Sequence, residues 1–471
     1  MTANAATGKL KLGTKLAYGS GDLGAAIATA INGFFMLNFL LNVAGLQPWL
    51  VGIIYLVAKV VDAVADPVVG YLTDHTVSRF GRRRPWLLFA AVPFGLAFIM
   101  QWLVPPLGEF GKFFYYLVVA LLLDAAFNSV NMPYAAMTAE LTPDYNERTS
   151  LSSIRMSFSI IGGVLAAFFN GQIINLFPPG DSRGYTIGAI IWAVFITVPC
   201  FIVFFGTAGV APVAAKPAAK GPSFFEGMGI AFRNRAFVLV TLIYLFSWLA
   251  IQFVQTNLQL FTKDWIRIDV SQFSFLLLTI QTSSFIWVLI WAKVSERIGK
   301  KNIYYLGAAF FVAALISMFF IQPGQTALIF VLGAVAGIGI SVAYLVPWSM
   351  IPDVVEMDEL ETGQRREGVF YGFFVFVQKL GLAVGLAISS WVLQLAGYVT
   401  ASAANPSPVQ PDSALLALRA LIGPAAALVL LCSYVAVYLY PITREKHAQM
   451  RAELDKRAKE KQAVASSDVP V

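Results

Sequence analysis

DHTVSRFGRRRPW, at residues 74–86, is the stretch that decides the predicted fold. It joins two apolar segments and carries an acid, then Arg, an apolar residue, Gly and a basic pair. SERIGKKNIY, at residues 295–304, repeats this order at the corresponding place in the second half of the chain. Any short cytoplasmic loop tends to be basic, but the shared order favours an internal repeat. Two repeated halves with a binding site between them are typical of secondary transporters.

The composition excludes a water-soluble fold. Of the 471 residues, 58% are hydrophobic and 13% charged, with a mean hydropathy of +0.71, whereas soluble domains carry about 25% charged residues. A soluble enzyme, a coiled coil and a disordered scaffold are therefore excluded. The two cysteines lie in apolar runs and there are only two histidines, so we expect no disulfide framework, metal site or cofactor. The polar, basic N-terminus predicts no cleaved signal peptide.

Twelve apolar segments recur along the chain with short breaks, and each is long enough to cross a bilayer as a helix of about 20 residues. The sequence therefore predicts an all-α integral membrane protein of twelve transmembrane helices in two six-helix bundles. The expected spans are residues 16–41, 48–73, 85–105, 113–138, 153–177, 186–206, 237–262, 271–295, 302–321, 326–351, 368–396 and 414–440.

The positive charges support this map. Of the 33 Lys and Arg residues, 24 lie in the N-terminal arm, the C-terminal tail and the loops between them on one side, and 5 lie in the opposite loops. This bias predicts that both termini are cytoplasmic in a plasma (inner) membrane. The expected units are an N-terminal bundle (1–207), a cytoplasmic linker (208–236), a C-terminal bundle (237–440) and a charged, solvated, partly helical tail (441–471).

The second span carries ionisable residues, which are costly inside a bilayer and mark functional sites by default. Lys59, Asp62 and Asp66 follow the spacing i, i+3, i+7, which places all three on one helical face. Pro67 loosens the backbone hydrogen bonds beside Asp66. A self-neutralising pair of Lys59 with one Asp is the alternative, but it accounts for only one of the two carboxylates. The pair predicts a site for a proton or a small cation.

The fourth span carries a second polar face. Asp124, Asn128 and Asn131 lie at i, i+4 and i+7, an arrangement suited to the hydroxyl groups of a polar solute. Hydrogen bonding between helices, which contributes about 0.6–2 kcal/mol per bond, is the alternative.

The remaining deep charges are Asp22, Arg155 and Lys379. All the deep charges together leave one uncompensated negative charge, the balance expected of a site for one monovalent cation. Two weaker features are aromatic and polar residues. Tyr344 and Trp348 lie one turn apart in the tenth span and suit either a sugar ring or ordinary packing. The seventh span has Gln252, Gln255, Thr256 and Gln259 along one side.

Five motifs together resemble one family. They are YGSGDLG (18–24), KVVDAVADPVVGYLTD (59–74), RFGRRRPW (79–86), NMPYAAMTAELTPDYNERTSLSSIR (131–155) and PDVVEMDELETGQRREG with QKLG (352–381). The chain resembles the glycoside–pentoside–hexuronide:cation symporters, the melibiose-permease-like branch of the major facilitator superfamily. The resemblance implies solute uptake coupled to a cation by alternating access of two six-helix bundles.

The resemblance also implies roles for individual residues. Asp62 and Asp66 match the cation-site carboxylates, Lys379 the lysine beside them, Arg155 an arginine lining the solute path, and Tyr344 lies near the aromatic residue placed at the sugar. The chain departs from that pattern at Ala26, Ala65 and Asn131. Ala65 removes an amide oxygen that Na⁺ would use, so we expect H⁺ as the coupling ion, with Na⁺ as the alternative.

The basic loops also predict a gate. Asp74 with Arg79, Arg82 and Arg83 is expected to hold the inner sides of the two halves together when the cavity faces outward. Glu296 and Arg297, with Lys300 and Lys301, form the matching set in the second half. Plain charge bias of a membrane loop is the alternative.

The sequence thus predicts a proton-coupled symporter of a sugar or glycoside that is not an enzyme. Its partners are a small solute and membrane lipid, with no nucleic acid, and the chain is expected to be a monomer. A lysophospholipid carrier of the same fold, which the family also resembles, and a non-transporting membrane receptor are the alternatives.

Overall fold

The computed structural model describes residues 10–142, 144–210, 224–364, 366–402, 405 and 408–467. Within them the secondary structure is helical, apart from one isolated bridge between Ser402 and Asn405. The helices of the first half are α1 (Leu12–Gly19), α2 (Gly21–Asn42), α3 (Pro48–Asp74), α4 (Arg84–Met100), α5 (Glu109–Leu141), α6 (Tyr145–Asn175) and α7 (Ser182–Gly206). Those of the second half are α8 (Phe224–Arg233), α9 (Arg235–Phe261), η1 (Thr262–Ile266), α10 (Val270–Ile298), α11 (Lys300–Phe320), α12 (Thr326–Thr362), α13 (Glu367–Leu395), α14 (Asp412–Ala420), η2 (Leu421–Ala425), α15 (Ala426–Leu439) and α16 (Arg444–Ser467).

These helices form twelve apolar spans. Eleven segments of the described chain are long and apolar enough to cross a membrane, and α4 adds a shorter apolar helix of 17 residues. The prediction of an all-α protein with twelve spans is confirmed. The third span differs in length from its prediction, because α4 ends at Met100 rather than near residue 105. Pro105 and Pro106 follow, and the residue before a proline disfavours helical geometry.

Side chains at the loop–helix junctions fix where several spans begin. The Asp144 carboxylate accepts a hydrogen bond from the Glu147 backbone N–H at 2.8 Å, and Asn234 accepts one from Phe237 at 3.0 Å. Asp269 and Gln272 cap α10 reciprocally. These acceptors satisfy backbone donors that a helix leaves unpaired in its first turn.

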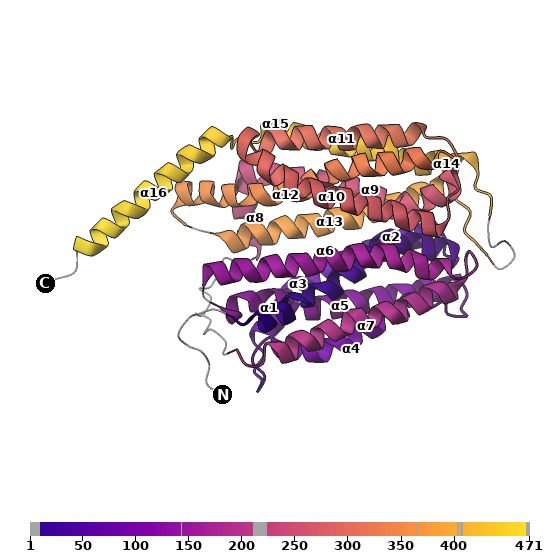
Figure 1. The fold of residues 1–471 in the computed structure, drawn as a ribbon, viewed down its shortest axis with the longest axis horizontal. Coiled ribbons are helices and arrows are strands. Elements are labelled where there is room, and N and C mark those ends of the chain that lie inside the picture. The colour runs from indigo at the N-terminus through magenta and orange to yellow at the C-terminus, as the bar shows by residue number, and fades with distance from the viewer. Residues whose placement is uncertain are drawn as a thin grey trace.

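The helices are arranged in two bodies that lie side by side. Figure 1 shows α1–α7, in indigo to magenta, in one body and α8–α15, toward orange and yellow, in the other. The first and last described helices, α1 and α16, lie toward the same end of the molecule (Figure 1). We call that end the proximal end and the opposite end the distal end.

The two halves are joined at the middle and at the distal end. The contacting pairs are α3 with α13, α6 with α10 and α2 with α9. Near the distal end, Asn42 Nδ2 donates to Tyr398 Oη at 3.0 Å, and Ser271 Oγ donates to Gln172 Oε1 at 3.0 Å. In the part of the chain that the structure describes, no hydrogen bond or ion pair joins the halves closer to the proximal end than the contact of Lys379 with Asp66.

The predicted linker and the predicted tail each contain a helix that contacts the C-terminal bundle. Residues 211–223 of the expected linker lie outside the described residues, whereas 224–233 form helix α8, which contacts α9 and α13. The tail forms α16, and its first turns contact α12. His447 Nε2 lies 3.2 Å from Glu356 Oε2, and the Met450 side chain is buried. Arg457 Nη1 still donates to the Leu360 carbonyl at 2.9 Å, and the far end of α16 extends away from the bundle (Figure 1).

Small residues set the distance between α11 and α12. A Cβ at Gly339 of α12 would lie 2.2 Å from the Phe311 Cβ and 2.8 Å from the Gly307 carbonyl oxygen, both on α11. Glycine at such positions allows helix backbones to approach closely in a membrane protein, where no hydrophobic effect drives helices together.

We expect Gly339→Ala to destabilise the folded protein by about 1–3 kcal/mol, because the added methyl group meets backbone atoms that cannot yield. Thermal unfolding of the detergent-purified protein measures the effect. Gly372→Ala is the matched control, because a Cβ there has no neighbour within 4 Å and alanine favours a helix. Equal thermal midpoints for the two variants would contradict the close packing of α11 on α12.

Candidate functional site

A central cavity of about 350 Å³ lies between the two halves. Its walls come from α2, α3, α4 and α5 of the first half and from α9 and α13 of the second. Four charged residues line it, namely Lys59, Asp62, Asp124 and Lys379. Most of the remaining wall is apolar or aromatic, including Tyr55, Phe94, Tyr116 and Phe127. A largely apolar pocket with a few convergent polar groups is typical of a small-molecule site.

Lys379 of α13 connects the second half to two carboxylates of the first. Its Nζ lies 2.6 Å from Asp66 Oδ2 and 3.1 Å from Asp62 Oδ2, both on α3. Asn128 Nδ2 donates to the other oxygen of Asp62 at 2.6 Å. The structure therefore brings together the lysine and the two carboxylates that the sequence predicted as a coupling site. It also adds Asn128, which was predicted to bind solute.

Lys59 of α3 pairs mainly with a residue of another helix, α5. Its Nζ lies 2.9 Å from Asp124 Oδ1 on α5 and 3.9 Å from Asp62 Oδ2 on α3. Asp124, predicted on a solute-binding face, is thus paired with a residue of the predicted cation site. The alternative prediction paired Lys59 with an Asp of its own helix. In the structure its main counter-ion is instead Asp124.

The pairing shows where the surplus negative charge lies. Asp22 pairs with Arg155, and Asp124 is the main partner of Lys59, which lies farther, at 3.9 Å, from Asp62. Asp62 and Asp66 share Lys379. The one uncompensated negative charge counted from the sequence therefore falls on the Asp62–Asp66 pair.

Asp66 has an oxygen available for a further ligand. Its Oδ1 is buried and has no hydrogen-bond partner within the described residues, although its Oδ2 contacts Lys379. The Asp66 side chain is 22% exposed, whereas that of Asp62 is 7% exposed. Asp66 also lies one turn closer to the proximal end. Asp66 is therefore the more exposed of the two carboxylates.

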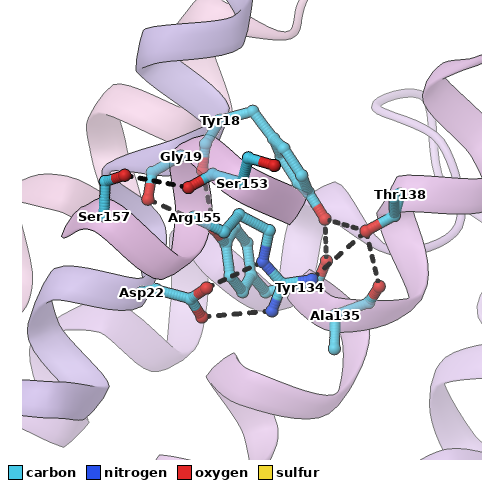
Figure 2. A network of polar contacts seen from close by, with 9 residues as sticks. All are labelled: Tyr18, Gly19, Asp22, Tyr134, Ala135, Thr138, Ser153, Arg155 and Ser157. Carbon is cyan, nitrogen blue, oxygen red and sulfur yellow. Dashed lines mark hydrogen bonds and ion pairs between the residues drawn. The ribbon is translucent and has the colours of Figure 1, made fainter. Parts of the chain in front are cut away.

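Asp22 and Arg155 form a separate network near the proximal end (Figure 2). Arg155 Nε and Nη2 donate to the two oxygens of Asp22 at 2.8 and 3.1 Å, and Nη1 donates to Thr138 Oγ1 at 3.2 Å. Its guanidinium also lies 4.6 Å from the centre of the Tyr134 ring. These contacts join α2, α5 and α6, and neither Asp22 nor Arg155 lines the central cavity. Their role in solute binding stays a prediction, and the geometry favours a joint between helices.

The remaining predicted solute residues also lie outside the cavity lining. Trp348 Nε1 donates to Tyr244 Oη at 3.0 Å, and the Tyr344 ring packs edge-on against Trp248 with centroids 4.9 Å apart. The two side chains form part of an aromatic cluster on α9, α12 and α13. Asn131 is partly buried on α5, and its solute role stays a prediction.

Several cavity residues were given no role by sequence reasoning. Gln101 Nε2 donates to Asn32 Oδ1 at 3.0 Å and joins α4 to α2. The missed polar lining residues are Thr29, Asn32, Gln101 and Gln378. A single amide within an apolar span is the only sequence signal that they offer. Gln252 and Thr256, noted on the seventh span, do line the cavity.

The basic loops bind acids within their own halves. Arg82 Nη2 and Arg83 Nε lie 2.7 and 3.3 Å from Glu140 Oε1 at the end of α5. Arg79 lies over the Phe80 ring. The side chain of Asp74 lies outside the described residues. Sequence reasoning missed Glu140, which lies at the end of the long α5.

The matching loop of the second half shows a similar pairing. Lys300 Nζ lies 2.7 Å from Asp353 Oδ2 on α12. The Arg297 backbone carbonyl accepts a hydrogen bond from Arg444, and Lys301 donates to the carbonyl of Tyr440 at 2.9 Å. For Glu296, no side-chain hydrogen bond or ion pair is found within the described chain. These contacts lie within one half, so the predicted clamp between halves stays a prediction.

The whole site lies within one family match. A family model described as "MFS/sugar transport protein" matches residues 17–444. The chain belongs to this family. An uncharacterized symporter of Synechocystis sp. is 34% identical, with 97% of this chain and 99% of that protein aligned. The inner membrane symporter YicJ of Escherichia coli is 29% identical over 92% and 93% of the two chains. A sodium-dependent lysophosphatidylcholine symporter of Danio rerio is 29% identical over 94% and 88%.

Solved structures agree with the fold of this family member. A bacterial homolog of the human lysosomal transporter Spinster aligns over 91% of this chain and 95% of its own, with a TM-score of 0.66 and 14% identity. The nucleoside transporter NupG aligns over 91% and 99% with a TM-score of 0.63 and 13% identity. This MFS protein is therefore a multi-pass membrane transporter and not an enzyme.

The Lys59–Asp124 pair provides a test of the site's electrostatics. We expect Asp124→Leu to lower stability by up to about 3 kcal/mol, because it leaves the ammonium of Lys59 without its main counter-ion in an apolar wall. The double variant Lys59→Met with Asp124→Leu should recover most of this loss. Thermal unfolding of the three proteins gives the coupling energy. Additive losses would show that the two side chains do not interact.

Proposed function

We propose that this transporter is a proton-coupled symporter of a sugar or glycoside. The observation that carries the proposal is the single Lys379 shared by Asp62 and Asp66 across the two halves. Two carboxylates and one ammonium leave a negative charge that a bound cation would neutralise. Because Lys379 also lines the central cavity and Asp66 does not, a proton at Asp66 would act on the solute site through Lys379.

Alternating access links this charge to transport. When Asp66 is ionised, the attraction between α3 and α13 is strong and holds the halves in one relative position. Protonation of Asp66 removes one of the two charges that attract Lys379. A ligand shifts a conformational equilibrium by its difference in affinity for the two states. The proton and the solute would therefore favour a common rearrangement of the two halves.

The oxygens at the site support H⁺ rather than Na⁺. Na⁺, like other hard cations, requires several oxygen ligands at once. Here one oxygen of Asp62 accepts from Asn128, and the ammonium of Lys379 contacts the other oxygen and one oxygen of Asp66. Only Asp66 Oδ1 among these four carboxylate oxygens lacks a partner in the described part of the chain. One free oxygen accommodates a proton but not a Na⁺ coordination shell.

The cavity walls support a solute with hydroxyl groups and apolar faces. Amide and carboxylate groups of Asn32, Gln101, Gln378 and Asp124 can exchange hydrogen bonds with sugar hydroxyls. The aromatic and aliphatic walls can contact the C–H faces of a sugar ring. The family description, sugar transport, supports the same class.

A sodium-coupled lysophospholipid carrier is the second candidate. Several aligned relatives are named sodium-dependent lysophosphatidylcholine symporters, and the apolar part of the cavity wall would suit an acyl chain. Competition distinguishes the candidates, since a sugar carrier should bind glycosides and ignore lysophosphatidylcholine.

We further propose that the protein functions as a monomer in the inner membrane, with the proximal end in the cytoplasm. The Lys and Arg bias of the proximal loops supports this orientation. We also propose the units predicted from the sequence, namely an N-terminal bundle (1–207), a cytoplasmic linker (208–236), a C-terminal bundle (237–440) and a charged tail (441–471).

Asp66→Asn should abolish concentrative uptake, because an amide keeps the shape of the side chain but cannot bind and release a proton. Solute exchange down its gradient should persist at a reduced rate. Proteoliposome uptake of a sugar panel, with and without an inward proton gradient, measures both. Concentrative uptake by the variant equal to that of the parent would exclude Asp66 as the coupling carboxylate.

A separate experiment identifies the coupling ion. At constant Na⁺, uptake should rise with an inward proton gradient and fall on addition of a protonophore. Ala65→Asn should introduce Na⁺ sensitivity, because it places an amide oxygen beside Asp66. Uptake by the parent that saturates with Na⁺ and ignores the pH gradient would favour the sodium-coupled alternative.

A further inference from the structure

A second cavity, of about 310 Å³, lies at the distal end between the two halves. Its walls come from α2, the turn between α6 and α7, α7, the end of α9, η1 and the start of α10. It shares no lining residue with the central cavity. None of the coupling residues reaches it, so the proposed symport mechanism leaves this cavity without a role.

Gln259 of α9 is the observation that points to a ligand. Its side chain is 3% exposed and lines the cavity. Neither its Nε2 nor its Oε1 makes a hydrogen bond of good geometry in the described parts of the chain, and only a weaker contact with the Tyr185 hydroxyl lies nearby. Buried amides in proteins are normally bonded, and each exception requires an explanation. A group in the cavity that both accepts and donates would satisfy both atoms.

The surrounding groups indicate an uncharged partner. Asn38 Nδ2 donates to Tyr185 Oη at 3.0 Å, and Asn42 Nδ2 donates to Asn38 Oδ1 at 2.9 Å, so amides and a phenol form a neutral polar wall. Lys263 and Asp269 supply one charge of each sign at the rim. The Asp269 carboxylate already caps α10, accepting from Gln272 at 2.6 Å.

The lining also has apolar groups. Phe177 of the α6–α7 turn and the buried Phe273 of α10 belong to it. A lining of amides and aromatic rings matches a sugar ring, whose hydroxyls exchange hydrogen bonds and whose C–H faces pack on apolar surface. A charged headgroup would find no net counter-charge here.

We propose that this distal cavity is a second binding site for one uncharged sugar ring, with Gln259 as its principal hydrogen-bonding residue. The proposal rests on the sugar class of solute proposed above but not on the coupling ion. Because the cavity lies at the distal end between the halves, a solute there would be on the distal side of the central site.

Equilibrium binding on the full-length protein in lipid nanodiscs tests the site. The probes are radiolabelled methyl glycosides of glucose, galactose and xylose, measured without any ion gradient. The parent should bind two equivalents of at least one probe. The double variant Lys59→Met with Asp124→Leu, which alters only the central cavity, should retain the distal equivalent.

Gln259→Leu should weaken the distal equivalent by about tenfold or more, because it removes two hydrogen bonds while keeping the side-chain size. Tyr185→Phe is a second, milder variant of the same wall. Gln322→Leu is the matched control, since Gln322 lies exposed in the α11–α12 loop away from both cavities. It should bind both equivalents as the parent does. Size-exclusion profiles establish that each variant is folded.

Three results would overturn the proposal. They are binding of a single equivalent by the parent, no binding of any probe by the central-cavity double variant, and unchanged distal binding in both Gln259→Leu and Tyr185→Phe. The first two would mean that the distal cavity binds none of the probes, and the third that the second equivalent binds away from Gln259. Two equivalents with uptake that ignores the proton gradient would instead disprove proton coupling and leave the distal site intact.

Discussion

The ammonium of Lys379, shared by Asp62 and Asp66, is the interaction on which the arrangement of the two halves depends. A charge inside a membrane protein must be paired or hydrated, so the position of α13 against α3 is fixed by where these groups meet. The pair is also short of one positive charge. A contact that is both necessary for packing and incompletely neutralised is suited to respond to a proton.

The other buried charges have complete partners. Arg155 with Asp22 is a bidentate pair reinforced by Thr138 and Tyr134, and Lys59 with Asp124 is a simple pair across two helices of the same half. Such pairs join helices within a bundle, and moving the bundles against each other does not break them. Among these deep ion pairs, only the contacts of Lys379 cross between the halves. The ion pair suited to coupling is therefore distinct from the pairs that join helices within one half.

The polar groups at the distal end serve a different purpose from those at the centre. Asn42 and Tyr398 join the halves by neutral hydrogen bonds, and Tyr398 also donates to Asp264 at 2.8 Å. Neutral bonds are weaker than ion pairs and can be exchanged for bonds to water when the halves separate. The distal closure is thus a reversible contact, beside which Gln259 remains unsatisfied.

The sequence by itself determined the twelve spans, the side on which the basic loops gather and the shared face of Asp62 and Asp66. These features depend on hydrophobic length and on the 3.6-residue period, which are properties of a local segment. The tertiary structure decided the partners. Lys59 lies closer to Asp124 than to Asp62, and Asn128 donates a hydrogen bond to Asp62 at the coupling site. Arg155 pairs with Asp22, and the Gln259 amide lines a cavity without a hydrogen bond of good geometry. Lys379 and Asp66 are 313 residues apart, and their meeting depends on which helix faces pack together, which no local pattern encodes.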